Sequence, residues 1–154
     1  MKVPEGWTWL RCEKVVEVSP GSSSELLGDI DVSFLGMADV SEDGKVSTAH
    51  RRKVSEVSNG FTYFENNDVL VAKITPCFEN GKGALVSNLV NGRGFGSTEF
   101  HVLRAKPQIE PEFLFLLTRT HAFRANGEKH MVGSAGQKRV PEVDPNVWTT
   151  KRRN

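Results

Sequence analysis

Two stretches of the chain collect side chains that donate hydrogen bonds or carry positive charge. Hydroxyl, amide, ammonium and guanidinium groups are what phosphate oxygens and base edges accept, and small residues let a backbone approach a partner closely. The stretch over 73–82 holds Lys73, Thr75, Asn80 and Lys82, and the stretch GSAGQKRV over 133–140 holds Ser134, Gln137, Lys138 and Arg139. The second stretch favours contact with a polyanion over a plain polar loop. For Lys73, a solvent-facing lysine on an edge strand is an equal alternative.

A third basic cluster, Arg51-Arg52-Lys53, interrupts a polar segment over 45–57. Such a run is usually a solvated face, and it contacts phosphate only if the fold turns it to the side of Lys73 and Arg139. The net charge is +1, but residues 119–154 hold eight basic and three acidic side chains. This asymmetry is compatible with a polyanionic partner and equally with a solvated basic tail.

Motifs for nucleotide binding are incomplete in this sequence. GRGFGS over 92–97 lacks the G-x-G-x-x-G spacing at the start of a helix, and Gly81-Lys82-Gly83 has no Ser or Thr after its lysine. Both stretches therefore predict turns. The histidines have no metal-ligand spacing, so a zinc site is not expected.

The cysteines leave a catalytic and a bland interpretation. Cys77 could act as a nucleophile with one of the four histidines as its base. A buried, unreactive thiol is strongly favoured instead, because free cysteine is among the most buried residue types. Cys12 and Cys77 are too few for a disulfide framework, and no signal peptide is visible, so we expect a reducing cytoplasm. The longest apolar run, over 113–117, is too short to span a bilayer.

A compact antiparallel sheet over 68–100 would position the first donor stretch. Apolar runs predict strands over 69–74, 84–90 and 100–103, and Asn80-Gly81 and Asn91-Gly92 predict tight turns between them. Further strands are expected over 32–37 and 61–64. The polar residues should then gather at the turns of the sheet.

One helix is expected over 111–126. Pro111 suits its first turn and Asn126-Gly127 its end. At helical spacing one apolar arc faces the sheet, made of Phe113, Leu116, Leu117, Thr120 and Phe123. At 154 residues, a single domain is the default expectation.

Six segments, taken in order, resemble a known family. They are VPEGWTWLRCEKVVEV, VSFLGMADVSEDGKV, NDVLVAKITPCFENGKGALV, GFGSTEFHVLRA, PEFLFLLTRTHAFR and GSAGQKRVP, which together extend from Val3 to about Val147. They are similar to a target recognition domain of the DNA specificity subunit of type I restriction–modification systems. The resemblance implies an α+β fold with a strongly twisted antiparallel, β-helix-like sheet region and flanking helices.

The resemblance also implies a function without an active site. Such a subunit reads one half of a bipartite double-stranded DNA target and brings methyltransferase (modification) and restriction subunits to it, and those subunits use S-adenosylmethionine and ATP. A full specificity subunit has two recognition domains separated by spacer helices that pair as a coiled coil. Here residues 1–154 are expected to form one recognition domain with no spacer helix. An excised domain, a half-subunit that homodimerises or joins a partner half, and a remnant all stay open.

Residue type and loop placement assign expected roles to the donor side chains of such a DNA-binding module. Phosphate contacts are expected from Lys53, Lys73, Lys82, Lys138 and Arg139, with Thr75 and Ser134 beside them. Asn80 and Gln137 are expected to pair with adenine, and Arg51 or Arg52 with guanine. Base-reading residues should come from the least family-like stretches, including 41–56, whereas Gly96-Ser97-Thr98-Glu99 should shape the fold or grip the DNA backbone. The alternatives are a general RNA-binding module, a small cysteine hydrolase using Cys77, and a remnant that only contacts protein.

Overall fold

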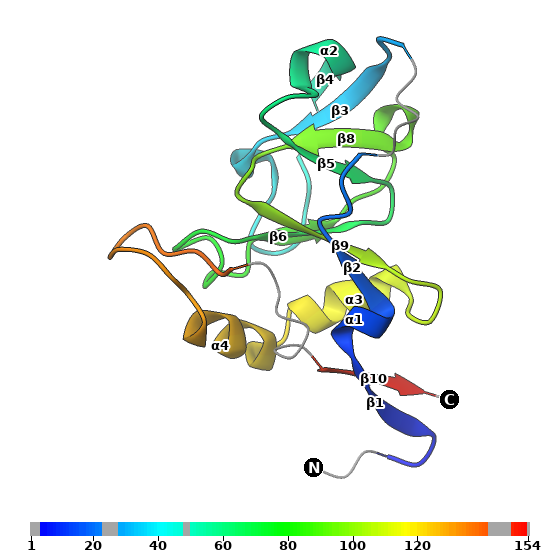
Figure 1. Ribbon diagram of the computed structural model, residues 1–154, viewed down its shortest axis with the longest axis vertical. Helices are drawn as coiled ribbons and strands as arrows, with labels where there is room; N and C mark the ends of the chain where they lie inside the picture. The colour runs from blue at the N-terminus through cyan, green and yellow to red at the C-terminus, as the bar shows by residue number, and fades with distance from the viewer. Residues whose placement is uncertain (1–3, 23–27, 48–49, 142–148, 154) are drawn as a thin grey trace.

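The chain folds around two four-stranded sheets and a short two-stranded sheet. The structure is a computed structural model that describes residues 4–22, 28–47, 50–141 and 149–153 (Figure 1). The first sheet has the order β2-β9-β6-β7, formed by Val16–Val18, Phe100–Ala105, Val69–Ala72 and Gly83–Leu85. The second has the order β4-β3-β8-β5, formed by His50–Lys53, Asp31–Leu35, Arg93–Gly96 and Thr62–Glu65. Strands β1 (Trp7–Arg11) and β10 (Thr149–Arg153) pair antiparallel.

Helices are few and short. They are α1 (Cys12–Val15), α2 (Val54–Val57), α3 (Pro111–Thr118) and α4 (His121–Lys129), with 3-10 turns η1 (Met37–Asp39) and η2 (Val90–Gly92). The mixed α and β content and the mainly antiparallel sheets agree with the coarse expectation of an α+β fold, with one departure: β3 and β8 pair in parallel. No helix in the described part of the chain has the length and apolar character needed to cross a membrane.

Strand β6 lies at the centre of the molecule, between two apolar cores. Val69 and Val71 pack with Phe78, Leu103 and Leu114 on the side of α1 and α3. Leu70 and Ala72 pack with Leu35, Phe64 and Phe100 toward the second sheet. Because alternate residues of a strand point to opposite faces, the VLVA run fills both cores at once. The first sheet therefore lies between the second sheet and helices α1, α3 and α4, whereas α2 packs on the second sheet (Figure 1).

A buried carboxylate joins the two sheets. Asp68, which is 1% exposed and precedes β6, accepts two 2.8 Å hydrogen bonds from the Arg104 guanidinium of β9. Its Oδ2 also accepts a 2.7 Å hydrogen bond from the backbone N–H of Glu65 in β5. Glu65 in turn lies 3.3 Å from Arg104 Nη2 and accepts a 2.9 Å hydrogen bond from the Tyr63 hydroxyl. Burial, assisted by Glu65, raises the pKa of Tyr63 to about 12.

The glycine-rich stretch predicted as a turn is instead a strand. Residues 93–96 form β8, which pairs with both β3 and β5. A Cβ atom on Gly94 would lie 2.3 Å from the Phe64 ring, and one on Gly96 would lie 2.3 Å from the Leu35 carbonyl oxygen. The glycines therefore allow close packing inside a sheet, which their composition alone did not reveal.

The helix predicted over 111–126 is two helices. Arg119 ends α3, and Thr120 begins α4, where its hydroxyl accepts a 3.2 Å hydrogen bond from the Phe123 N–H. The predicted apolar arc is also wrong, because Leu116 is 60% exposed whereas Leu114 is buried. Gly127 does not stop the helix: it lies inside α4 and packs against Phe78.

Candidate nucleic-acid interface

Backbone hydrogen bonds bring the two donor stretches together. The N–H of Thr75 donates to the carbonyl of Lys138 at 2.9 Å, and the N–H of Val140 donates to the carbonyl of Lys73 at 2.9 Å. The bridge between Ile74 and Arg139 lies between these bonds. Residues 73–82 and 131–140 together are the hairpin platform. This pairing places the two stretches side by side.

The second segment of the hairpin platform is a projecting hairpin. Val132 and Arg139 exchange two 2.9 Å backbone hydrogen bonds, and the Gln137 N–H donates to the Ser134 carbonyl at 3.0 Å. Gly133 and Gly136 have φ of 123° and 82°, which glycine adopts without strain. Ser134, Gln137 and Lys138 are exposed on this hairpin, which stands out from the body between the first sheet and α4 (Figure 1).

Arg139 is paired with a carboxylate, although its side chain remains 43% exposed. Its Nε lies 3.0 Å from both carboxylate oxygens of Glu99, and its Nη2 lies 2.8 Å from Glu99 Oε1. The fork lowers the pKa of Glu99 below its ordinary value. The carbonyl of Glu99 accepts a 2.9 Å hydrogen bond from the Lys73 N–H, so Glu99 ties both segments of the hairpin platform to the start of β9.

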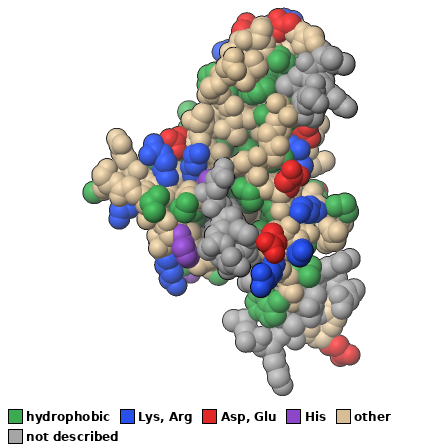
Figure 2. Space-filling view, viewed as in Figure 1, with side chains coloured by type: hydrophobic (Ala, Val, Ile, Leu, Met, Phe, Trp, Pro, Cys, Tyr) green, Lys and Arg blue, Asp and Glu red, His purple; other side chains and the backbone are tan. Residues whose placement is uncertain are grey.

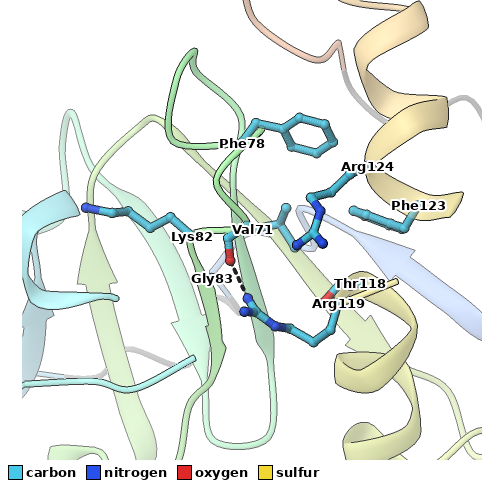
Figure 3. Close-up of a pocket in the computed structure, with 9 residues that line it drawn as sticks. Val71, Phe78, Lys82, Gly83, Thr118, Arg119, Phe123 and Arg124 are labelled. Atoms are coloured by element: carbon cyan, nitrogen blue, oxygen red, sulfur yellow. Dashed lines mark hydrogen bonds between the residues drawn. The ribbon is translucent and has the colours of Figure 1, made fainter. Parts of the chain in front are cut away.

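The segment over 75–82 holds three more of the predicted DNA-binding residues, and their side chains differ in exposure and in hydrogen bonding. The Asn80 side chain is exposed, and its N–H donates to the Pro76 carbonyl at 3.1 Å. Thr75 is partly buried, and its hydroxyl donates to Glu79 Oε2 at 2.5 Å. The Lys82 ammonium donates to the Met37 carbonyl at 3.1 Å and points away from α3 and α4 (Figure 3). Of these three side chains, that of Asn80 is the exposed one.

The third basic cluster lies elsewhere. Arg51, Arg52 and Lys53 belong to β4, at an edge of the second sheet and well apart from the projecting hairpin (Figure 1). Lys53 and Arg51 lie 2.9 and 3.4 Å from the Asp31 carboxylate, and Lys53 is the main cause of the lowered pKa of Asp31. Arg52 donates to the carbonyl of Arg51 at 2.9 Å. The structure does not bring this β4 edge to the hairpin platform.

Two arginines that the sequence interpretation missed lie beside the loop over 76–82. Arg119, at the end of α3, donates from Nη1 to the Gly81 carbonyl and from Nη2 to the Glu42 carbonyl. Arg124 of α4 also reaches Gly81 (Figure 3). The basic surplus of the C-terminal residues could have pointed to these two arginines. The helix break at Arg119 was missed because one continuous helix was predicted over 111–126.

Charge is distributed unevenly over the surface. In the face drawn in Figure 2, Lys and Arg side chains gather on the side that carries the projecting hairpin and α4, with an acidic side chain beside them, and acids and bases also intermingle on the opposite side. This is the arrangement that a polyanion would meet with favourable electrostatics.

The cysteines and histidines do not form a site in the described part of the chain. Cys12 is buried, and burial raises the pKa of its thiol to about 11. Cys77 is half-buried beside the core around Leu70. His50 pairs with Asp39, His101 Nε2 lies 2.8 Å from the Val140 carbonyl, and His130 Nδ1 lies 2.8 Å from the Asn126 carbonyl. Among the described residues, no group of three or more His, Cys, Asp or Glu could hold a metal ion.

Comparison with known proteins shows which class of protein this chain resembles. The chain is homologous to specificity subunits of type I restriction enzymes. It is 40% identical over 147 residues to the type I restriction enzyme EcoAI specificity subunit of Escherichia coli, and 36% identical over 145 residues to the EcoEI specificity subunit of the same organism. The resemblance found in the sequence is thereby confirmed.

The relatives are much longer than this chain. Each alignment covers 91% of the chain but 24% of the relative, so the chain spans about a quarter of the length of the curated relatives it matches. No protein-family model matches.

Solved structures agree on the fold. A structure from work on complex assembly and conformational transition of the type I R-M system superposes with a TM-score of 0.71 at 24% identity, covering 99% of this chain and 39% of that one. The HsdS subunit from Thermoanaerobacter tengcongensis gives a TM-score of 0.67 at 23% identity, with the same coverage.

Proposed function

We propose that this chain is a non-catalytic module that recognises double-stranded DNA in a type I restriction–modification system. It reads one half of a bipartite target and directs methyltransferase and restriction subunits to that site. The observation that carries the proposal is the 40% identity, over 91% of the chain, to a type I specificity subunit. An exposed donor-rich hairpin beside a second donor-bearing loop supplies the kind of surface that such a module needs.

The hairpin platform is the proposed DNA-binding face. Lys73 and Lys138 contact phosphates, because neither forms an ion pair among the described residues. Gln137 and Asn80 have amides suited to adenine edges, and Ser134 sits among small residues that allow close approach. Arg139, Thr75 and Lys82 are engaged within the protein, so their role in this proposal is to hold the segments in place.

Wider features of the proposal follow from the family resemblance. Residues 1–154 act as one recognition domain, whose sheets have the strong β-helix-like twist of the family, and the chain works in the cytoplasm. The second half of the target is read by a partner half-subunit or by a second copy of the chain. A single module buries about 600–1,000 Å² of its surface on DNA and binds weakly by itself. The β4 edge takes part only if the duplex extends along the long axis of the molecule.

The salt dependence of duplex binding tests where the DNA lies. Lys73→Ala combined with Lys138→Ala should lower the slope of log affinity against log salt by about two phosphates, roughly 1.8. The matched control, Arg51→Ala combined with Lys53→Ala, removes the same charge and should leave the slope unchanged. A larger effect from the control pair would move the interface to the β4 edge.

Selection from random duplex DNA tests sequence recognition. The experiment is run with and without a type I methyltransferase subunit, and Gln137→Ala should relax preference at one position. Single-stranded DNA and RNA are included as competitors. Preferential binding of RNA, or an unselective duplex pool in both arms, would refute the proposal.

A further inference from the structure

Two guanidinium groups converge on the backbone of Gly81. A Cβ atom placed on Gly81 would lie 2.6 Å from Arg124 Nη1 and 3.6 Å from Arg119 Nη1. The two nitrogens are therefore no farther apart than the sum of those distances. Gly81 itself has a φ of 75°, so a side chain there would be strained as well as obstructive. The loop is thus built to leave room for both arginines (Figure 3).

The positive charge of this pair is not balanced by a described acid. Arg119 donates to the carbonyls of Gly81 and Glu42, which are neutral acceptors, and its guanidinium lies 5.8 Å from the centre of the Phe115 ring. The Arg124 backbone N–H donates to the Thr120 carbonyl, but its guanidinium forms no hydrogen bond or ion pair with any described residue, although Arg124 is partly buried. Like charges this close repel each other. An anion placed between them would attract both guanidinium groups and offset that repulsion.

The shape of the site limits where an anion can sit. Both arginines line a hollow of about 10 Å³ together with Val71, Phe78, Thr118 and Phe123. That volume holds about one water molecule, so an anion must lie at its mouth and not inside. Arg119 is fixed by the two carbonyls it contacts, and the planar fork of Arg124 remains available, which is the geometry that suits a tetrahedral oxyanion.

We propose that Arg119 and Arg124 form an oxyanion site, and that its ligand is a phosphodiester of the DNA backbone. This rests on the proposed function for the identity of the ligand, although not for the existence of the site. Arg119 and Arg124 flank the same loop that carries Asn80, so a phosphate held there would fix the duplex beside the hairpin platform. The DNA backbone would then be contacted by four side chains: Lys73, Lys138, Arg119 and Arg124. The sequence analysis assigned no role to either of these arginines.

Inorganic phosphate tests the site without DNA. In the full chain, titration with phosphate at constant ionic strength should give a saturable shift of the Gly81 and Gly83 amide resonances. Arg124→Gln should abolish the shift, and Arg124→Lys should weaken it, because lysine keeps the charge but not the fork. Lys53→Gln removes the same charge from the β4 edge and should leave the shift intact. An equal response in wild type and Arg124→Gln would overturn the site, as would a shift lost equally in Lys53→Gln.

Duplex DNA then tests the ligand. Arg124→Gln should lower the salt slope of duplex binding by about 0.9, with sequence preference retained. If wild type shows the phosphate shift but binds no duplex, the proposed function fails and the site stands. If the phosphate shift is lost in Arg124→Gln but the duplex slope is unchanged, assignment to the DNA backbone is refuted. The thermal midpoint of each variant, compared with that of Arg124→Lys, shows whether the fold was kept.

Discussion

The hairpin platform and the β4 edge are both basic, but their charges are balanced differently. On the β4 edge, Arg51 and Lys53 share the Asp31 carboxylate. On the hairpin platform, Arg139 is matched by Glu99, whereas Lys73 and Lys138 form no ion pair among the described residues. Three consecutive basic residues in the sequence are therefore a weaker indication of a polyanion site than basic residues collected from separate segments.

Strand geometry explains why the consecutive run does not act as one cluster. Successive side chains of a strand point to opposite faces, so Arg51 and Lys53 lie on the face of Asp31 and Arg52 lies on the other. The hairpin platform is assembled from two segments about sixty residues apart, joined by backbone hydrogen bonds to Lys73 and Thr75. Its charges therefore depend on the tertiary fold.

The largest expected effect concerns the buried joint between the two four-stranded sheets. Asp68→Ala leaves the Arg104 guanidinium without its buried partner and removes the acceptor of the Glu65 N–H. Loss of one partner of a buried ion pair costs about 3–5 kcal/mol, and urea denaturation should show a decrease of that size. Asp43→Ala, which removes an exposed carboxylate paired with Lys45, is the control and should change stability little. Equal effects of the two substitutions would mean that Asp68 does not hold the sheets together.

A smaller effect should separate the two regions in DNA binding. Glu99→Gln and Asp31→Asn each remove one negative charge beside basic side chains. Glu99→Gln releases Arg139 within the hairpin platform, so affinity for random duplex at low salt should rise several-fold and the salt slope should steepen by up to about 0.9. Asp31→Asn should change neither quantity. The reverse result, measured by fluorescence anisotropy, would exchange the roles of the two regions.

Glu99 also predicts a pH dependence. Because Arg139 lowers the folded-state pKa of Glu99, the stability from this pair is fully present above the ordinary value of 4.5. It is lost as the pH falls through the lower folded-state pKa. Both side chains are partly exposed, so the effect is small. Thermal midpoints measured between pH 3 and 6 should fall less steeply in Glu99→Gln than in wild type.

The sequence was informative where local chemistry determines the structure. The VLVA run of β6 and the strand that begins at Phe100 formed as expected. The expectation from the family resemblance that 96–99 shapes the fold agrees with the packing of Gly96 on Leu35 and the fork between Glu99 and Arg139.

Other features depend on partners that no local pattern specifies. Gly94 and Gly96 resemble turn residues until Phe64 and Leu35 are placed against them. The helix break at Thr120 requires a capping hydrogen bond to compete with continued apolar periodicity. Arg124 had no distinguishing neighbours in sequence, and its position beside Gly81 depends on that break.

The smallest predicted effect is a titration that reports on the joint between the two sheets. Tyr63 is the chain's single tyrosine, so ultraviolet absorbance should follow its ionisation alone. The folded protein should titrate near pH 12 instead of the ordinary 10, because ionisation would place a buried phenolate beside Glu65. A raised folded-state pKa contributes stability that is complete below pH 10 and is lost as the pH rises toward about 12. Glu99→Gln and Asp31→Asn should leave this titration unchanged, since each alters only its own region. Asp68→Ala should move the pKa of Tyr63 toward 10 by loosening Glu65. A wild-type titration near 10 would show that Tyr63 is not held in this joint between the sheets.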